Sequence, residues 1–299
     1  MSHVSQVPAR LTPLVDPHAT AGTRRLAWLA RDADDNPVGT AFLRLFDREG
    51  QRHLAELTLR VHPAERRAGI GTGLLAAAVE AARTDGRRSL LAGADGDSPG
   101  ELFLAARKFR RVLRLTYTRL VLADADRRAL ATTAGRPCPG YRLTEWDGTV
   151  PDGLAESFAA ARRAMDDMPM DDADYGHVEW DVERVRAVAE AVADRGDLLH
   201  TVAALDERDG SVAGFTELVV PGSREGDGRH YGTGVLPGHR GKGLARWMKA
   251  DQILRLRARH PELTGLVTDT ADSNRPMRAV NDALGYVPTH RSCEYQLDL

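Results

Sequence analysis

Two stretches of the sequence share one pattern, in which Pro, Arg and small residues recur at the same spacing. The first begins at Pro63 and reads Pro-Ala-Glu-Arg-Arg-Ala-Gly-Ile-Gly; the second begins at Pro237 and reads Pro-Gly-His-Arg-Gly-Lys-Gly-Leu-Ala. Each follows an apolar run typical of a strand and precedes apolar residues at helical spacing. The arginines lie 174 positions apart (240 minus 66). That separation predicts two duplicated domains rather than a short repeat.

The order of predicted elements is similar in the two halves. In the first half we expect strands at 25–31, 38–46, 54–61, 88–92 and 112–122, with helices from the loop to about 86 and at 99–107. In the second half we expect strands at 141–146, 198–205, 212–220, 230–236, 263–270 and 293–297, with helices at 152–165, 182–193, after the loop and at 276–284. Strands that come first and then alternate with helices predict an α/β fold of the α+β type, with a mixed sheet in each domain.

The apolar periodicity is lost between Ala123 and Gly140, where Asp, Arg, Gly and Pro accumulate. Such a composition is typical of a connection between domains. The sequence therefore predicts an N-terminal domain at 1–123, a linker at 124–139 and a C-terminal domain at 140–299.

Composition excludes several classes of function. The 41 basic and 43 acidic residues nearly cancel, which argues against a nucleic-acid-binding surface. The sequence contains no apolar run of membrane-spanning length and no signal peptide in residues 1–20, so we expect a soluble cytoplasmic protein without a membrane partner. Cys138 and Cys293 have no metal-ligand spacing; we expect two reduced thiols and no metal site.

A basic, glycine-rich turn between a strand and a helix presents bare backbone N–H groups to a phosphorylated ligand. Neither copy has the Gly-x4-Gly-Lys-Ser/Thr pattern of a P-loop. A dinucleotide fingerprint, Gly-x-Gly-x-x-Gly after the first strand of a βαβ unit, also fails, because both loops follow a hairpin. The remaining interpretation is Arg-x-x-Gly-x-Gly/Ala between a fourth strand and a third helix.

This last pattern resembles the acetyl-CoA diphosphate loop of the GNAT N-acetyltransferase superfamily, and the resemblance covers almost the whole chain. It implies two tandem GNAT-like domains and acetyl-CoA (coenzyme A) as the cofactor. The residues that it assigns to the coenzyme are Val61, Arg66, Arg67, Gly69, Gly71 and Thr72 in the first half, and Val235, Leu236, Arg240, Gly241, Lys242, Gly243, Leu244 and Ala245 in the second.

The resemblance continues after the second loop. GNAT domains often carry an Asn that contacts the pantetheine arm, and then a helix that ends in Leu-Gly-Phe/Tyr. Asn274 and the run Leu-Gly-Tyr at 284–286 fit this pattern, which also assigns Asn281 to the coenzyme. Aligning Phe109 with Tyr286 puts Asp97 at the Asn274 position. In this detail the chain resembles a tandem-GNAT group common in actinobacteria, a layout also found in mycothiol synthases.

The reaction that the resemblance implies is direct attack of an amine on the thioester, which requires a base, a polarised carbonyl and a proton for the leaving thiolate. In GNAT enzymes a bulge in the strand before the loop frees a backbone N–H, and the matching segments here are 59–61 and 233–236. The family's usual general acid, a Tyr, is replaced by Asn281 and by Leu104.

Three side chains are candidates for acid–base chemistry. Glu56 lies on the strand that enters the first loop, and alignment of Pro63 with Pro237 puts His230 opposite it, with Tyr231 next. Histidine titrates near neutrality and suits a base. Each residue also has a non-catalytic interpretation. His230 would then be a surface residue at the start of a strand, and Glu56 a solvated residue at a sheet edge.

In GNAT domains the segment between the first two strands covers the acceptor. The second half devotes residues 151–196 to it, and the first only about 17–23. We therefore expect catalysis in the C-terminal domain. The acidic run 166–172 either attracts a cationic amine or is a solvated loop.

The sequence thus predicts an acetyl-CoA-dependent N-acetyltransferase that acts on the amine of a small molecule. One alternative is a tandem protein that holds acyl-CoA without turnover. Another, a nucleotide-dependent oxidoreductase, would require NAD(P) binding.

Overall fold

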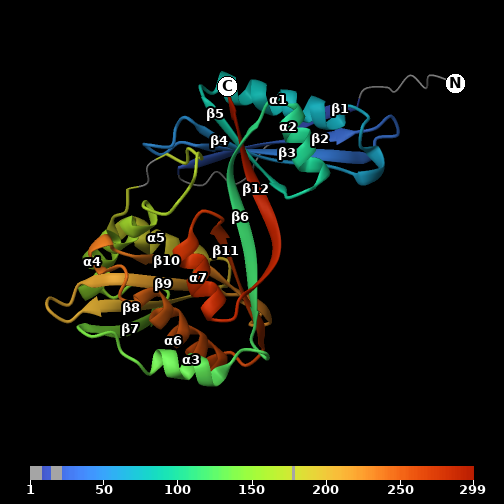
Figure 1. Cartoon of the computed structure of the whole chain (residues 1–299). Coiled ribbons are helices and arrows are strands. Elements are labelled where there is room, and N and C mark those ends of the chain that lie inside the picture. Colours follow the sequence, from blue (N-terminus) through green and yellow to red (C-terminus); the bar gives the residue numbers. More distant parts are fainter. Residues whose placement is uncertain (1–8, 15–21, 177–178) are drawn as a thin grey trace. The chain divides into compact units, whose positions relative to one another are not determined.

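The computed structural model describes residues 9–14, 22–176 and 179–299 of the chain, drawn in Figure 1. The described residues form two compact units. The N-terminal unit contains residues 9–114, 170–176 and 292–299, apart from 15–21, and the C-terminal unit contains residues 115–169 and 179–291.

The N-terminal unit is a mixed sheet with strand order β1-β2-β3-β4-β5-β12. The first three pairings are antiparallel, β4 and β5 are parallel, and β12 is antiparallel to β5. Its elements up to the last helix are β1 (Arg10–Leu14), β2 (Thr23–Arg31), β3 (Pro37–Phe46), β4 (Leu54–Val61), the 3₁₀ turn η1 (Pro63–Glu65), α1 (Ile70–Thr84), β5 (Ser89–Asp95) and α2 (Pro99–Ala106).

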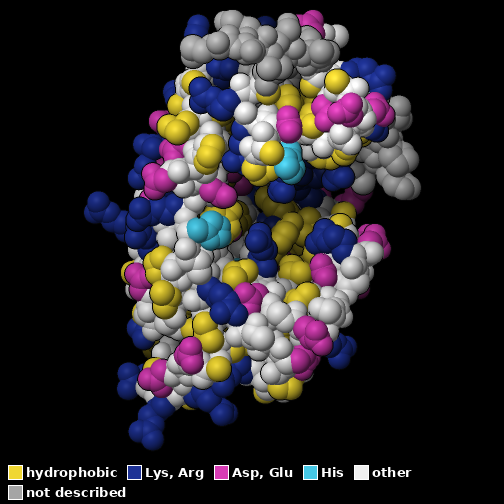
Figure 2. Space-filling view, turned by 90° about the vertical axis from the view of Figure 1, so that its right-hand side faces the viewer, with side chains coloured by type: hydrophobic (Ala, Val, Ile, Leu, Met, Phe, Trp, Pro, Cys, Tyr) yellow, Lys and Arg dark blue, Asp and Glu magenta, His cyan; other side chains and the backbone are white. Residues whose placement is uncertain are grey.

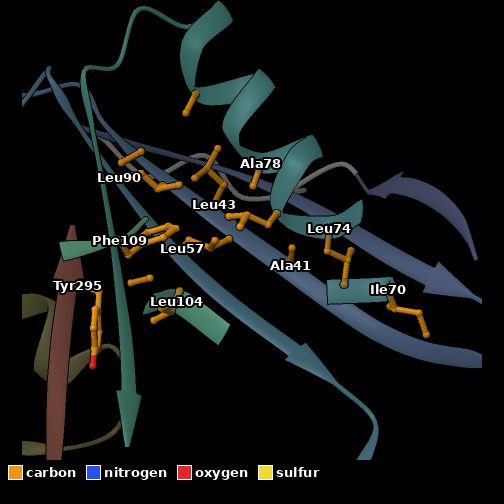
Figure 3. Close-up of a cluster of buried hydrophobic side chains, with 14 of the residues drawn as sticks. Ala41, Leu43, Leu57, Ile70, Leu74, Ala78, Leu90, Leu104, Phe109 and Tyr295 are labelled. Atoms are coloured by element: carbon orange, nitrogen blue, oxygen red, sulfur yellow. The ribbon is translucent and has the colours of Figure 1, made fainter. Parts of the chain in front are cut away.

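Helix α1 covers one face of this sheet. Leu74, Leu75, Ala78 and Ala82 lie on one side of the helix and are buried, as their spacing of three to four residues predicts. Figure 3 shows Leu74 and Ala78 directed at the side chains of β3 and β4, including Leu43. Full burial of one such leucine contributes about 1.5–3 kcal/mol. This core fixes α1, and with it the loop that precedes α1.

The C-terminal unit has the strand order β6-β11-β10-β9-β8-β7. Helix α6 covers one face of its sheet, and α4 and α5 cover the other. The remaining elements of the chain are β6 (Arg110–Val121), α3 (Arg127–Ala134), β7 (Tyr141–Asp147), α4 (Asp152–Arg162), η2 (Arg163–Met165), α5 (Val182–Ala193), β8 (Leu198–Asp206), β9 (Val212–Val220), β10 (Gly226–Val235), η3 (Pro237–His239), α6 (Leu244–Arg259), β11 (Leu263–Ala271), α7 (Arg275–Ala283) and β12 (Val287–Asp298). All belong to the C-terminal unit except residues 110–114 of β6 and 292–298 of β12.

The last strand of each half completes the sheet of the other unit. In the N-terminal unit, residues 292–298 of β12 pair with β5, from Ser292 opposite Asp95 to Asp298 opposite Ser89. In the C-terminal unit, residues 115–121 of β6 pair with β11. Tyr295 of β12 therefore belongs to the core of the N-terminal unit (Figure 3). Each unit depends on a strand from the opposite half of the sequence.

A further segment of the second half belongs to the N-terminal unit. Residues 170–176, which we expected to cover the acceptor of the second domain, lie in the N-terminal unit. The Asp174 carboxylate lies 2.9 Å from His53 Nε2, and Gln51 Nε2 donates to the Tyr175 carbonyl at 3.0 Å. The expected acceptor segment 151–196 is thus shared between the two units.

The largest differences from the predicted elements concern β1, β12 and the linker. Strand β1 was not predicted, and β12 begins six residues earlier than expected. The presumed irregular linker contains helix α3, capped by the Asp126 side chain and anchored by buried Leu130. Of the short segment 17–23 in the first half, residues 17–21 lie outside the described residues.

The surface mixes charges of both signs. Figure 2 shows Lys and Arg side chains interspersed with Asp and Glu over one face of the molecule. No helix in the described part of the chain combines the length and apolar character needed to cross a lipid bilayer.

Candidate active site

The two basic loops have nearly the same backbone. Pro63 and Pro237 each start a three-residue 3₁₀ turn. The residues that follow these turns, Arg66 and Arg240, have an extended backbone, with φ of −69° and −67°. Each arginine donates through Nε to the carbonyl of the preceding strand's last residue. The sequence repeat is therefore a repeat of local conformation.

Glycine permits the final turn of both loops. Gly69 and Gly243 precede the first residue of α1 and α6 with φ of 83° and 84°. This left-handed region is strained for residues with a Cβ atom. Gly69 and Gly243 have no side chain that could cap the helix. The first backbone N–H groups of α1 and α6 therefore remain open for an anion.

The first loop borders a cavity of about 1030 Å³. Its wall combines the inner faces of β4 and β5, the loop, the start of α1 and helix α2. The parallel pairing of β4 and β5 ends at Leu57 and Ala92, so beyond these residues the two strands no longer pair with each other. All six residues that the sequence assigned to the first loop line it: Val61, Arg66, Arg67, Gly69, Gly71 and Thr72.

Helix α2 contributes lining residues that the sequence analysis missed. Arg107 follows α2, lines the cavity and donates to Thr72 Oγ1 at 2.6 Å. Its guanidinium lies 5.3 Å from the centre of the Phe103 ring, which also lines the cavity. The sequence did contain a signal for this role. In the alignment of Phe109 with Tyr286, the basic pair Arg107-Lys108 of the first half replaces Leu284-Gly285 of the second.

The charged side chains of the second loop have partners within the C-terminal unit. Arg240 donates to the Asp167 carboxylate at 2.9 Å, and Lys242 Nζ donates to the Tyr141 hydroxyl at 2.6 Å. Asp167 belongs to the acidic run for which the sequence left a cationic amine as one partner. Its observed partner is the loop itself.

The other coenzyme residues expected in the second half have mainly structural contacts. Leu244 is buried in the core beneath α6. Asn274 caps α7 by accepting from the Met277 N–H. The corresponding cap of α2 is Ser98, so the alignment of Asp97 with Asn274 was wrong by one residue. Asn281 is buried and donates to Thr270 Oγ1 at 3.2 Å. The remaining expected residues, Val235, Leu236, Gly241 and Ala245, lie in the strand end, loop and first helical turn around Gly243.

The model of the acetyltransferase (GNAT) family matches residues 7–101 and 163–286, more than half of the chain. The chain belongs to the GNAT acetyltransferase family. Mycothiol acetyltransferase of Sanguibacter keddieii is 32% identical over 72% of the chain, and that of Stackebrandtia nassauensis is 30% identical over 82%. The matched parts cover 66% and 74% of those proteins, so the chain spans just under two thirds of the first.

Solved structures support a tandem GNAT architecture. A tandem GNAT protein from the clavulanic acid biosynthesis pathway matches with a TM-score of 0.76 and 27% identity, over 94% of this chain and 84% of that one. A GCN5-related N-acetyltransferase from Sphaerobacter thermophilus has the same fold, with a TM-score of 0.65 at 17% identity over 91% of this chain and 80% of that one. Two GNAT regions in one mixed α/β chain are thus confirmed.

The two GNAT units differ in the strand before the loop. In β10 an extra residue, Tyr231, separates His230, which pairs with Leu218, from Gly232, which pairs with Glu217. We expected the bulge within 233–236, and it lies just before that segment, between His230 and Gly232. β4 pairs with β3 without interruption from Ala55 to Val61, so no bulge in that pairing interrupts 59–61.

The bulge separates the two side chains that the alignment put together. One extra residue moves all earlier side chains of a strand to the opposite face of the sheet. His230 therefore lies on the α6 face with Leu218, whereas Glu56 alternates with the core residues Ala55 and Leu57 and lies on the face away from α1. In its three-dimensional position His230 corresponds to Leu57. The two residues are not counterparts.

The environment of His230 favours a neutral ring. His230 is buried, and its Nε2 lies 2.6 Å from the Tyr286 hydroxyl. Burial, and then the nearby Lys249 ammonium, hold the His230 pKa well below its ordinary value. Burial also lowers the pKa of Lys249 to about 7. Tyr231 is 45% exposed, and Glu56 forms an ion pair with Arg44.

The described residues include no group of three or more His, Cys, Asp or Glu side chains arranged to hold a metal ion.

Proposed function

We propose that the chain is an acetyl-CoA-dependent N-acetyltransferase that acetylates the amine of a small molecule, and that the N-terminal cavity is a coenzyme site. The observation that carries the proposal is the 1030 Å³ cavity, which combines a helix N-terminus, glycine backbone and four arginines, Arg60, Arg66, Arg67 and Arg107. This combination suits a diphosphate and a further phosphate at one end. The facing edges of β4 and β5, which do not pair with each other beyond Leu57 and Ala92, suit an extended arm at the other end.

Bound acetyl-CoA would supply an activated acetyl group as a thioester. The amine nitrogen forms a bond to the acetyl carbon as the carbon–sulfur bond breaks; the amine loses a proton and the thiolate gains one. The Gly69 turn and the first turn of α1 hold the diphosphate through backbone N–H groups. Arg107, oriented by Thr72, neutralises phosphate charge.

Catalysis in the C-terminal domain remains a prediction from the longer acceptor segment. Two observations favour the N-terminal unit as the better coenzyme site. Its loop arginines line a cavity, whereas Arg240 and Lys242 are engaged by Asp167 and Tyr141. Moreover, residues 170–176, which come from the longer acceptor segment of the second half, belong to the N-terminal unit.

The engaged second loop also favours the non-catalytic alternative for the C-terminal unit, in which that unit serves as a structural partner. Under this alternative acetyl-CoA binds once per chain, at the first loop.

The test compares two glycines in the first turn of α1. Gly71 lines the cavity, and a Cβ atom there would lie 3.4 Å from the Phe103 ring; Gly73 is exposed, and a Cβ atom there would lie 4.0 Å from Leu11 Cδ1. We expect Gly71→Leu to abolish acetyl-CoA binding in calorimetry and Gly73→Leu to leave it intact. Coenzyme A release across a panel of small amines, with the acetylated product identified by mass spectrometry, tests the transfer. Binding without release on any amine, or NAD(P) binding in the same cavity, would contradict the proposal.

A further inference from the structure

A buried ion pair lies on the α4 face of the C-terminal sheet. Arg162 ends α4, and its side chain is 5% exposed; Glu217 on β9 is 3% exposed, and the two form a hydrogen-bonded ion pair. Removal of both charges from water is costly, and mutual attraction compensates only in good geometry. A pair of apolar side chains would fill the same volume without that cost. The pair therefore calls for an explanation beyond packing.

Aromatic rings surround the Arg162 guanidinium. Its central carbon lies 4.0 Å from the centre of the Trp180 ring, 5.2 Å from that of Phe215 and 5.8 Å from that of Tyr231. Aromatic faces around a carboxylate are a common way in which proteins bind organic cations. We call the set Trp180, Phe215, Tyr231 and Glu217 the cation box.

The cation box lies at the bulge of β10. Tyr231 is the extra residue of the bulge, and Glu217 is the pairing partner of Gly232. A Cβ atom on Gly232 would lie 3.8 Å from Arg162 Nη1 and 3.2 Å from Met165 Cε. Arg162 and Met165 thus occupy the space directly in front of the bulged backbone.

Arg162 does not satisfy its full hydrogen-bonding capacity there. Its Nε is buried and has no hydrogen-bond partner within the described chain. A guanidinium offers five donors in a fixed fork, and an unsatisfied buried donor is unfavourable. The box therefore fits a cation in general better than it fits this particular arginine.

We propose that the cation box is the acceptor subsite of the C-terminal unit and that the Arg162 side chain occupies it in place of a small organic cation, a primary ammonium or a guanidinium. The cation site stands on the contacts above, whereas its role as an acceptor subsite rests on the proposed acetyl transfer. With Arg162 in the box, the C-terminal unit is closed to an acceptor.

The test removes the internal cation and supplies an external one. Arg162→Ala deletes the atoms of ethylguanidinium and leaves Glu217 buried without its partner. We expect a melting temperature lower by about 10 °C. Millimolar ethylguanidinium should restore part of this loss, because it binds only the folded variant. Ethylammonium should do the same.

Matched variants make the result specific. Arg163→Ala removes the exposed neighbour of Arg162, and neither it nor the wild-type protein should respond to ethylguanidinium. Arg162→Ala/Glu217→Gln removes both charges, and the response should disappear.

Two results overturn the cation site: a folded Arg162→Ala that does not respond, or a response of equal size in Arg163→Ala. A response to ethylguanidinium but not to ethylammonium overturns the acceptor assignment. If Arg162→Ala is insoluble, its recovery on refolding with and without ethylguanidinium replaces the melting temperature, and equal recovery overturns the proposal. These measurements use no acetyl-CoA, so their failure is distinct from a failure of acetyl transfer.

Discussion

The two basic loops share a backbone but differ in what surrounds them. Arg66 and Arg67 of the first loop line a cavity, whereas Arg240 and Lys242 of the second are bound by Asp167 and Tyr141. The loop conformation depends on glycine and on the position of the helix start, which both halves retain. Its capacity to bind depends on side chains that lie far away in sequence. Duplication of a motif therefore does not establish duplication of a site.

The layers beneath the two helices differ as well. Leu75 and Ala78 of α1 are counterparts of Lys249 and Gln252 of α6, 174 positions on. The N-terminal layer is apolar. The C-terminal layer contains buried Gln252, which donates to the carbonyls of His200 and Thr216, and Lys249, whose ammonium lies 5.1 Å from the centre of the Tyr286 ring. The N-terminal layer therefore gains stability from the burial of apolar side chains, whereas the C-terminal layer includes polar groups whose burial is unfavourable without hydrogen-bond partners.

The largest difference should appear in coenzyme affinity. Gly69→Val places a β-branched residue at φ of 83° and brings a side chain against the diphosphate site. We expect acetyl-CoA affinity to fall by more than about a hundredfold, and Gly243→Val to leave it unchanged. Calorimetry on both variants, with melting temperatures to correct for backbone strain, makes the comparison. The reverse pattern would assign the coenzyme to the C-terminal unit.

The second difference concerns stability. The Lys249 pKa falls from 10.5 to about 7 in the folded protein because the side chain is buried. Between these values the unfolded chain binds more protons, so the free energy of unfolding should rise with pH across this window. Lys249→Leu, which introduces the residue found at position 75, should stabilise the protein at pH 6 by about 3 kcal/mol.

Denaturant unfolding at pH 6 and pH 9 tests this expectation. Arg246→Leu, an exposed position on the same helix, is the control. Destabilisation by Lys249→Leu at both pH values would mean that the ammonium has favourable contacts in the folded state.

The third difference separates Arg107 from its counterpart Leu284. Arg107→Ala removes a cation from the wall of the cavity, and we expect acetyl-CoA affinity to fall about tenfold, with a smaller effect at high salt. Affinity for acetyl-pantetheine, which lacks the charged end, should not change. Arg110→Ala, at an exposed position outside the cavity lining, is the control. An equal loss for both ligands would contradict a phosphate role.

The smallest effect concerns Glu294 on β12 in the N-terminal unit. Burial, and then the nearby Glu56 charge, raise its pKa from 4.5 to about 7. Between pH 4.5 and 7 the folded state binds more protons, so this residue lowers the stability of the unit as pH rises. Glu294→Gln should remove this slope, at a gain of less than about 1 kcal/mol at pH 8.

Hydrogen exchange of β5 amides at pH 5 and pH 8 reports on that unit alone. Glu80→Gln on the exposed face of α1 should leave the slope unchanged. An unchanged slope in Glu294→Gln would assign it to other groups.

The sequence predicted elements well where the local pattern was strong. Strands β4 (54–61) and β9 (212–220) and helix α5 (182–193) have the expected bounds, because turn residues flank the strands and the Asp181 cap starts the helix. Strand β1 has only five residues and α3 only one buried residue, Leu130. Such short elements leave too few apolar positions to define a period.

The sequence could not predict what depends on distant contacts. The exchange of β6 and β12 joins strands that lie far apart in the chain, and no local pattern encodes such pairing. The extra residue at Tyr231 has no signature in its neighbours, yet it decides which face His230 occupies. The six predicted first-loop residues all line one cavity, because glycine spacing specifies the backbone geometry of the loop. The side chains that bind the charged groups of the second loop, Asp167 and Tyr141, lie more than 70 positions away.

The strand exchange also sets the order of events during synthesis on the ribosome. Domains generally fold as they emerge, N-terminal domain first. Here β5 gains its second neighbour only from residues 292–298, and Ser292 lies 197 positions after its partner Asp95 (292 minus 95). Until then its free edge presents unpaired backbone groups that can pair with other nascent chains. The N-terminal unit is therefore complete only after residues 292–298 have been translated, and deletion of residues 292–299 removes a strand from its sheet.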